Sequence, residues 1–160
     1  MNHPVVFAGT FDPVTNGHLD IIRRARTIFG EVIVLLMPNA QKKTLFTLEE
    51  RAALIKEALA GETGVRVVTA EGLLVNFLKE HNLRVVVRGV RNASDWDYEM
   101  RNEAYNKLFY PELETVILPA RTDAWFISSS GVKEAFKYGA DISSLVPPCA
   151  LKALQKKLKI

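Results

Sequence analysis

The chain has 160 residues, of which 48% are hydrophobic and 24% are charged, and its formal net charge is +3. These values exclude a disordered or membrane-embedded chain. The length suits a single domain over residues 1–160. The 21 Lys and Arg residues are spread along the chain, so we expect no nucleic-acid partner. The longest purely apolar run, residues 32–37, is too short to cross a bilayer, and no secretory signal is visible. We therefore expect a cytoplasmic protein with no membrane partner, in which the lone Cys149 is structural.

Five apolar segments rich in β-branched residues predict strands, and each is followed by a helical pattern. The strands are predicted at residues 5–8, 32–37, 65–69, 85–87 and 115–118. Helices are predicted from residue 19, after the Thr47 and Glu50 capping-box pair, from residue 74, at about 94–109, before Gly139, and at about 148–158. The strands lack polar alternation, which is typical of a parallel sheet covered on both faces. The predicted fold is α/β, a doubly wound (Rossmann-like) five-stranded parallel sheet with helices on both faces and a C-terminal helix.

Ligands of such sheets bind outside the carboxyl ends of the strands. The segments that follow the predicted strands are residues 9–10, 39–43, 71–74, 88–91 and 120–130. They carry hydroxyls, arginines and lysines, which favour a phosphate-bearing ligand over a sugar, a metal or an acyl group.

The segment Thr15-Asn16-Gly17-His18 follows the first predicted strand and a turn at residues 9–16. His18 falls in the first turn of the next helix, where free backbone N–H groups and the helix dipole favour an anion. An imidazole there can share a phosphate with the backbone. The alternative is a histidine that only helps to start the helix.

Arg88-Gly89-Val90-Arg91 leaves the fourth predicted strand and places two guanidinium groups where they can reach one ligand. The planar fork of arginine suits phosphate, and Gly89 lets the backbone approach a ligand. The alternative is a pair of arginines that bridge to acids such as Asp95, Asp97 or Glu99.

The run Ile127-Ser128-Ser129-Ser130-Gly131-Val132-Lys133 precedes the fifth predicted helix. Its serines can cap the helix with one hydroxyl and offer others, with backbone N–H groups, to an anion. Lys133 opposes the dipole in the first turn unless an anion lies nearby. Serine runs that merely cap a helix are the alternative. Lys42-Lys43 can close over a phosphate or form a solvated loop.

The sequence lacks the residue patterns of several other kinds of site. His3, His18 and His81 have no Cys or His partners at ligand spacing, so no protein metal ligands are predicted. No P-loop motif, no dinucleotide fingerprint after the first strand and no nucleophile elbow occur.

The combination of Gly9-Thr10-Phe11-Asp12-Pro13-x-Thr15-x-Gly17-His18 with Ile127-Ser128-Ser129-Ser130-x-x-Lys133 resembles nucleotidyltransferases that carry T/H-x-G-H and I-S-S-x-x-x-K/R motifs. Within that superfamily, the further segments resemble the bacterial phosphopantetheine adenylyltransferases, from residue 4 to about residue 138. These segments are Lys42-Lys43, residues 46–51, Asn76-Phe77, Arg88-Gly89-x-Arg91 and residues 98–100.

The resemblance implies adenylyl transfer from ATP to 4′-phosphopantetheine, which yields dephospho-coenzyme A and pyrophosphate, with Mg²⁺ as cofactor and a homohexamer as assembly. The implied catalytic residues are His18, Thr10, Lys42 and Arg91. The implied ATP-binding residues are Thr10, Phe11, His18, Gly89, Val90, Arg91, Glu99, Ala124, Trp125, Phe126, Ile127, Ser128, Ser129 and Ser130. The implied phosphopantetheine-binding residues are Thr10, Lys42, Leu74 and Arg88, with Asn106 and Glu134 near the pantetheine arm.

Four details depart from the family pattern and concern substrate packing: Phe7, Gly72, Leu74 and the position of Trp125. The phosphate-handling residues are intact. Two other functions stay open, namely a sister nucleotidyltransferase that uses another phosphate acceptor and a non-catalytic nucleotide-binding module of the same fold.

Overall fold

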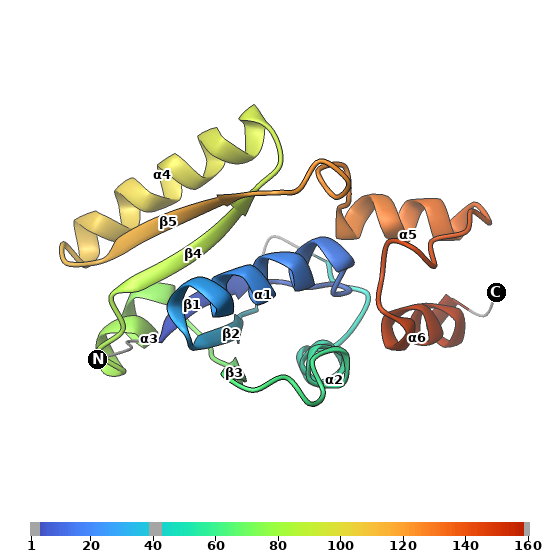
Figure 1. The fold of residues 1–160 in the computed structure, drawn as a ribbon, viewed down its shortest axis with the longest axis horizontal. Helices are drawn as coiled ribbons and strands as arrows, with labels where there is room; N and C mark the ends of the chain where they lie inside the picture. The colour runs from blue at the N-terminus through green and yellow to red at the C-terminus, as the bar shows by residue number, and fades with distance from the viewer. Residues whose placement is uncertain (1–3, 39–42, 159–160) are drawn as a thin grey trace.

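A five-stranded parallel sheet forms the centre of the protein (Figure 1). The computed structural model describes residues 4–38 and 43–158. The strands are β1 (Val5–Gly9), β2 (Val32–Leu36), β3 (Val65–Thr69), β4 (Val85–Val90) and β5 (Glu114–Pro119), in the spatial order β3-β2-β1-β4-β5. Every neighbouring pair is parallel. The predicted fold class is therefore confirmed.

Six helices are present within the described residues, at the places where the apolar periodicity predicts them. They are α1 (Asn16–Phe29), α2 (Leu48–Ala58), α3 (Leu74–Glu80), α4 (Ala93–Phe109), α5 (Ser129–Lys137) and α6 (Pro148–Leu158). The capping box of Thr47 and Glu50 starts α2 as predicted. Gly139 follows α5 with a φ of +83°, a conformation that suits a glycine just past a helix end.

The two faces of the sheet bury separate apolar clusters because side chains alternate along each strand. Val5 and Phe7 of β1 pack in a cluster with residues of α1, α2, α5 and α6, and this cluster includes Cys149. Val6 and Ala8 pack on the other face with residues of α3. Burial raises the pKa of the Cys149 thiol, which fits the structural role that we predict for it.

The order of the strands creates a switch point between β1 and β4. The chain moves from β1 to β2 and β3 on one side, and then returns to pair β4 with the other side of β1. In open α/β sheets, the carboxyl ends at such a point are where ligands bind. The segment after β5 leads to α5 beyond these strand ends (Figure 1).

No helix in the part of the chain that the structure describes is both long and apolar enough to span a membrane.

Candidate active site

The helix start that carries His18 is a capping box. Thr15 is the N-cap of α1, and its Oγ1 accepts a hydrogen bond from the backbone N–H of His18 (3.4 Å). In return, the backbone N–H of Thr15 donates to Nδ1 of His18 (3.1 Å). Since Nδ1 accepts this bond, the neutral imidazole carries its proton on Nε2. The Thr-x-x-His spacing therefore fixes both the ring orientation and the tautomer.

An aromatic contact supports the imidazole from the preceding turn. The ring of Phe11 meets the ring of His18 edge to face, with centroids 5.0 Å apart, and Phe11 is only 3% exposed. Phe11 has a φ of +51°, which is uncommon for a residue other than glycine. A Cβ at Gly9 would lie 2.7 Å from the Phe11 ring, so glycine is required beneath it. Because the Phe11 side chain is buried, its backbone is the part of this residue that can contact a ligand.

Two buried charged residues hold the turns around this helix start. Arg51 of α2, 3% exposed, donates from Nη1 to the carbonyl of Thr10 (2.6 Å). Asp12, 5% exposed, accepts from the backbone N–H groups of Leu45 and Phe46 (both 2.9 Å).

Asp12 also forms an ion pair with Lys133 of α5, at 2.5 Å. Burial alone would raise the pKa of Asp12, but the hydrogen bonds from Lys133, Leu45 and Phe46 lower it overall. The anion that we expect near Lys133 is therefore the carboxylate of Asp12, where the sequence suggested a bound phosphate.

The serine segment lies beside the start of α1. Ser128 is the N-cap of α5 and accepts from the N–H of Gly131 (3.0 Å), while Ser129 lies inside the helix and donates to the carbonyl of Pro13 (2.8 Å). A Cβ at Gly17 would lie 3.8 Å from Cβ of Ile127. The two motifs are therefore neighbours in space, although more than 100 residues separate them in the chain.

The other predicted ATP-binding residues of this segment differ in exposure. Ala124 and Ile127 are buried, whereas Trp125 and Phe126 are 54% and 57% exposed and their rings meet edge to face. Ser130 is exposed in the first turn of α5.

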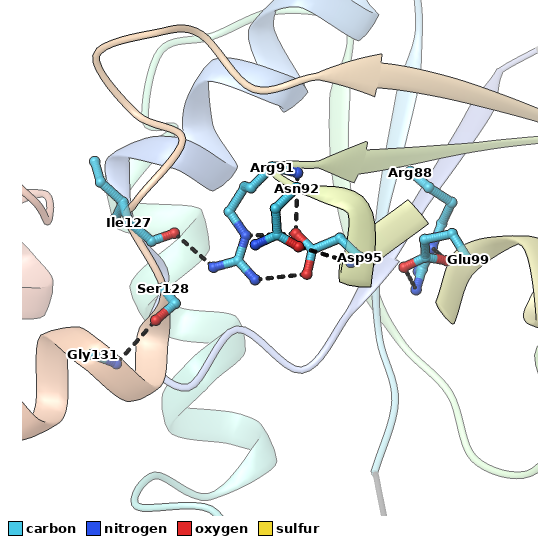
Figure 2. A network of polar contacts seen from close by, with 8 residues as sticks. All are labelled: Arg88, Arg91, Asn92, Asp95, Glu99, Ile127, Ser128 and Gly131. Carbon is cyan, nitrogen blue, oxygen red and sulfur yellow. Dashed lines mark hydrogen bonds and ion pairs between the residues drawn. The ribbon is translucent and has the colours of Figure 1, made fainter. Parts of the chain in front are cut away.

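The two predicted arginines lie apart, each against its own acid (Figure 2). Arg88 lies in β4, on the face that also bears Val86, and forms a two-point ion pair with Glu99. Arg91 follows the strand and forms a two-point ion pair with Asp95. The expectation that both guanidinium groups reach one ligand does not match this geometry, because Arg88 lies within β4 and Arg91 lies beyond its end, and each contacts a different acid. The bridges to acids, which the sequence left as an alternative, are present.

Gly89 and Val90 complete β4 and pair with β5. A Cβ at Gly89 would lie 3.1 Å from Cγ1 of Ile21 in α1. The structure thus adds a packing reason for glycine here, namely the close approach of α1.

A pocket of about 230 Å³ brings together Leu74, Arg88 and Asn106, three residues predicted at the phosphopantetheine site, and Glu99 also lines it. Glu134, on α5, is not among its lining residues. A larger pocket of about 440 Å³ lies between α1, α2 and the start of α6. It contains none of the predicted phosphate-binding residues, so we assign the chemistry to the smaller pocket and the adjoining switch point.

Of the two lysines predicted to follow the second strand, only one can be placed. Lys42 lies outside the described residues, and Lys43 is exposed.

Within residues 4–38 and 43–158, no group of three or more His, Cys, Asp or Glu side chains is placed to hold a metal ion.

Sequence reasoning assigned no role to Asp12 or Arg51. Arg51 had a signal, since it continues the apolar stripe of α2 at Leu48, Ala52 and Ile55 and is the one charged residue on it. Asp12 makes contacts that depend on the tertiary fold, and its partners are not evident from spacing alone. The partner of Asp95 lies only four residues away, and the sequence had already named this acid as a possible partner of the arginines.

Comparisons with known proteins match the part of the chain that contains this site. The model of the cytidylyltransferase-like family matches residues 6–135, which include the switch point and both motifs. The phosphopantetheine adenylyltransferase of Thermotoga neapolitana is 49% identical over 154 residues, 96% of each chain. The chain belongs to the phosphopantetheine adenylyltransferase family.

Two further members of this family agree. The phosphopantetheine adenylyltransferase of Psychromonas ingrahamii is 47% identical and covers 94% of this chain and 93% of its own. That of Heliobacterium modesticaldum is 45% identical and covers 95% and 90%. The phosphopantetheine adenylyltransferase resemblance read from the motifs is therefore confirmed, while the role of each site residue stays a prediction.

Proposed function

We propose that this protein transfers the adenylyl group of ATP to 4′-phosphopantetheine and forms dephospho-coenzyme A and pyrophosphate. The observation that carries the proposal is the orientation of His18 at the switch point, where Nδ1 accepts a backbone N–H and the proton is on Nε2. A neutral imidazole held in this way is a hydrogen-bond donor at a fixed place. Family membership supplies the substrates.

The reaction is an in-line displacement at the α-phosphorus. An oxygen of the 4′-phosphate attacks the α-phosphorus, the bond to the bridging oxygen of the β-phosphate breaks, and pyrophosphate leaves with the electron pair. The second pKa of a phosphate monoester is about 6, so the nucleophile is already largely a dianion at neutral pH and needs no general base. His18 donates from Nε2 to an oxygen of the transferring group, where negative charge develops.

The two arginines serve different substrates. Arg88 lines the pocket with Leu74 and holds the phosphate of phosphopantetheine. Arg91 donates to the carbonyl of Ile127 beside the N-terminus of α5, and it meets the phosphates of ATP there. Thr10 would contact both substrates, and Lys42, which lies outside the described residues, would contact the phosphopantetheine phosphate.

The carboxylates near the site bear on how Mg²⁺ binds. Asp12, Asp95 and Glu99 are each engaged in an ion pair. Mg²⁺ commonly keeps several waters and binds through substrate phosphates, so it would be held by the ATP phosphates, whose negative charge it would neutralise.

A pyrophosphate-release assay tests the function. ATP is supplied with 4′-phosphopantetheine, with nicotinate mononucleotide, with a polyol phosphate, or alone, and folding is checked by circular dichroism. We expect release that depends on phosphopantetheine. Release only with another acceptor would assign a sister nucleotidyltransferase, and none with any acceptor from folded protein would assign a non-catalytic module.

The assembly that we propose is a homohexamer in the cytoplasm. Apolar side chains on α4 that are about half exposed or more support self-association: Trp96, Tyr98, Tyr105, Leu108 and Phe109. Light scattering measures the mass of the assembly against 17.9 kDa per chain, and a monomer at micromolar concentration would contradict the proposal. Cell fractionation tests the compartment.

A further inference from the structure

Two acids of α4, one helical turn apart, hold the two arginines of the site in the same way (Figure 2). Glu99 accepts from Nε and Nη2 of Arg88 at 2.6 and 2.8 Å. Asp95 accepts from Nε and Nη2 of Arg91 at 2.8 and 3.1 Å. In each case the same edge of the guanidinium group meets the carboxylate.

A backbone carbonyl completes each arrangement on Nη1. Arg88 donates to the carbonyl of Ala8 in β1 at 2.6 Å, and Arg91 donates to the carbonyl of Ile127 at 3.1 Å. Each guanidinium group has five N–H groups, and three of them are engaged in these contacts. One N–H on each terminal nitrogen makes no hydrogen bond with the described residues, so each arginine keeps two donors for a single phosphate.

The burial of Glu99 is unusual for its helix. It is 8% exposed and is the one buried residue recorded for α4. An ionised carboxylate in such a place is unfavourable unless it is paired and hydrogen-bonded. Both of its oxygens are engaged by Arg88, and the pair lines the pocket that also contains Leu74.

We propose that Glu99 and Asp95 are positioning residues, which fix the guanidinium groups of Arg88 and Arg91 so that each presents its two remaining donors to one substrate phosphate. Glu99 then acts on phosphopantetheine through Arg88, although the resemblance places it at ATP. Asp95, for which the resemblance implies no role, acts on ATP through Arg91. The assignment of each phosphate to its substrate rests on the proposed function.

The test is the effect of Glu99→Gln and Asp95→Asn on both substrates, measured as KM in the pyrophosphate assay and as Kd by calorimetry. We expect Glu99→Gln to weaken phosphopantetheine about tenfold or more, with ATP within about twofold, because a misplaced guanidinium loses charge-assisted contacts. Asp95→Asn should weaken ATP about tenfold or more and leave phosphopantetheine within about twofold. Asp97→Asn, an exposed acid of the same helix, is the matched control and should leave both substrates unchanged.

A double-mutant cycle separates positioning from direct contact. In an Arg88→Ala background, Glu99→Gln should change phosphopantetheine binding less than about twofold, because its target is absent. If Glu99→Gln does not fold, Glu99→Asp keeps the buried charge and enters the same cycle.

Two outcomes would overturn the inference. One is a Glu99→Gln protein that is weakened toward ATP alone, which would place Glu99 in contact with the nucleotide. The other is a lowered unfolding midpoint with both Kd values unchanged, which would make the ion pairs purely structural. If the wild type makes no pyrophosphate with phosphopantetheine, the proposed function fails, and the Kd of ATP in the two variants still decides the inference.

Discussion

His18 has two ring nitrogens, and the structure engages one of them in the start of α1. Nδ1 accepts the N–H of Thr15 and so helps to start α1, which leaves Nε2 to carry the proton of the neutral imidazole. The two interpretations that the sequence left open, a helix-starting histidine and a phosphate ligand, therefore do not compete. A single residue can do both because the imidazole presents its nitrogens in different directions.

We predict that His18→Ala lowers turnover by at least about 100-fold and leaves the affinity for ATP within about tenfold, because a donor to developing charge is lost. The variant should also lose about 1 kcal/mol of stability, since the N–H of Thr15 loses its partner. Stopped-time pyrophosphate assays and ATP calorimetry measure the two effects separately.

The control for this prediction is His18→Gln. A glutamine at this position restores the capping box, so low turnover with recovered stability would attribute the loss to the imidazole. His81→Ala, at the end of α3, should be as active as wild type. An unchanged rate in His18→Ala would rule out the donor role.

The residues that sequence reasoning named and those that it missed differ in the range of their contacts. The Thr15 and His18 pair is three residues apart, so its spacing is visible in the chain. The partners of Asp12 lie 33, 34 and 121 residues away. A carboxylate whose partners come from two distant segments of the chain leaves no local pattern.

At the scale of elements, α1 and α2 both start with a capping box, but the residue at its third helical position differs. Thr15 pairs with His18 in α1, and Thr47 pairs with Glu50 in α2. The two helices therefore offer a matched comparison, because only the first capping box contains a residue of the site. Thr15 is also far more buried, at 1% exposed.

We predict that Thr47→Ala lowers the free energy of unfolding by about 1 kcal/mol and leaves turnover unchanged, as expected for the loss of an N-cap. Thr15→Ala should lower both, because its hydroxyl lies 3.1 Å from Nδ1 of His18. Urea unfolding and the pyrophosphate assay distinguish the two. Thr15→Ser keeps the hydroxyl and should retain most of the activity; equal turnover in Thr15→Ala and Thr47→Ala would contradict the coupling.

The strands show where local patterns stop being informative. The apolar run predicts β4 at residues 85–87, yet the strand continues to Val90. Arg88 and Gly89 have no strand pattern of their own, and they are held in the sheet by pairing with Ile117 and Leu118 of β5. Pairing with a strand nearly 30 residues away is a tertiary effect that overrides local preference.

At the scale of the whole molecule, the alternation of strands and helices predicts a parallel sheet, but it leaves the strand order open. The order places β4 beside β1, and this neighbourhood brings Arg88 to the carbonyl of Ala8 and the serine segment to the start of α1. The carboxyl ends of the strands were predictable as the site. Which two strands meet there was not, because that depends on long-range packing.

Asp12 joins three distant parts of this assembly, and it gives the fold a dependence on pH. Its contacts connect the turn after β1, the segment before α2 and helix α5. Its pKa is lowered below the ordinary value of 3.8, so the folded protein holds this proton more weakly than the unfolded chain does. The stabilisation is therefore fully present above 3.8 and is lost as the pH falls through the lowered value. The hydrogen bond from Arg91 lowers the pKa of Asp95 and adds in the same direction.

We predict that Asp12→Asn lowers the free energy of unfolding by about 1.5–3 kcal/mol at neutral pH, the usual contribution of hydrogen bonds to a charged group. The difference from wild type should be constant above pH 3.8 and narrow as the pH falls below this value, because the wild-type carboxylate becomes protonated and loses the same contacts. Urea unfolding at each pH measures it, with the slope against urea checked for constancy so that the unfolded state is the same in both proteins. Parallel curves for the two proteins over this range would show that Asp12 does not carry the acid sensitivity.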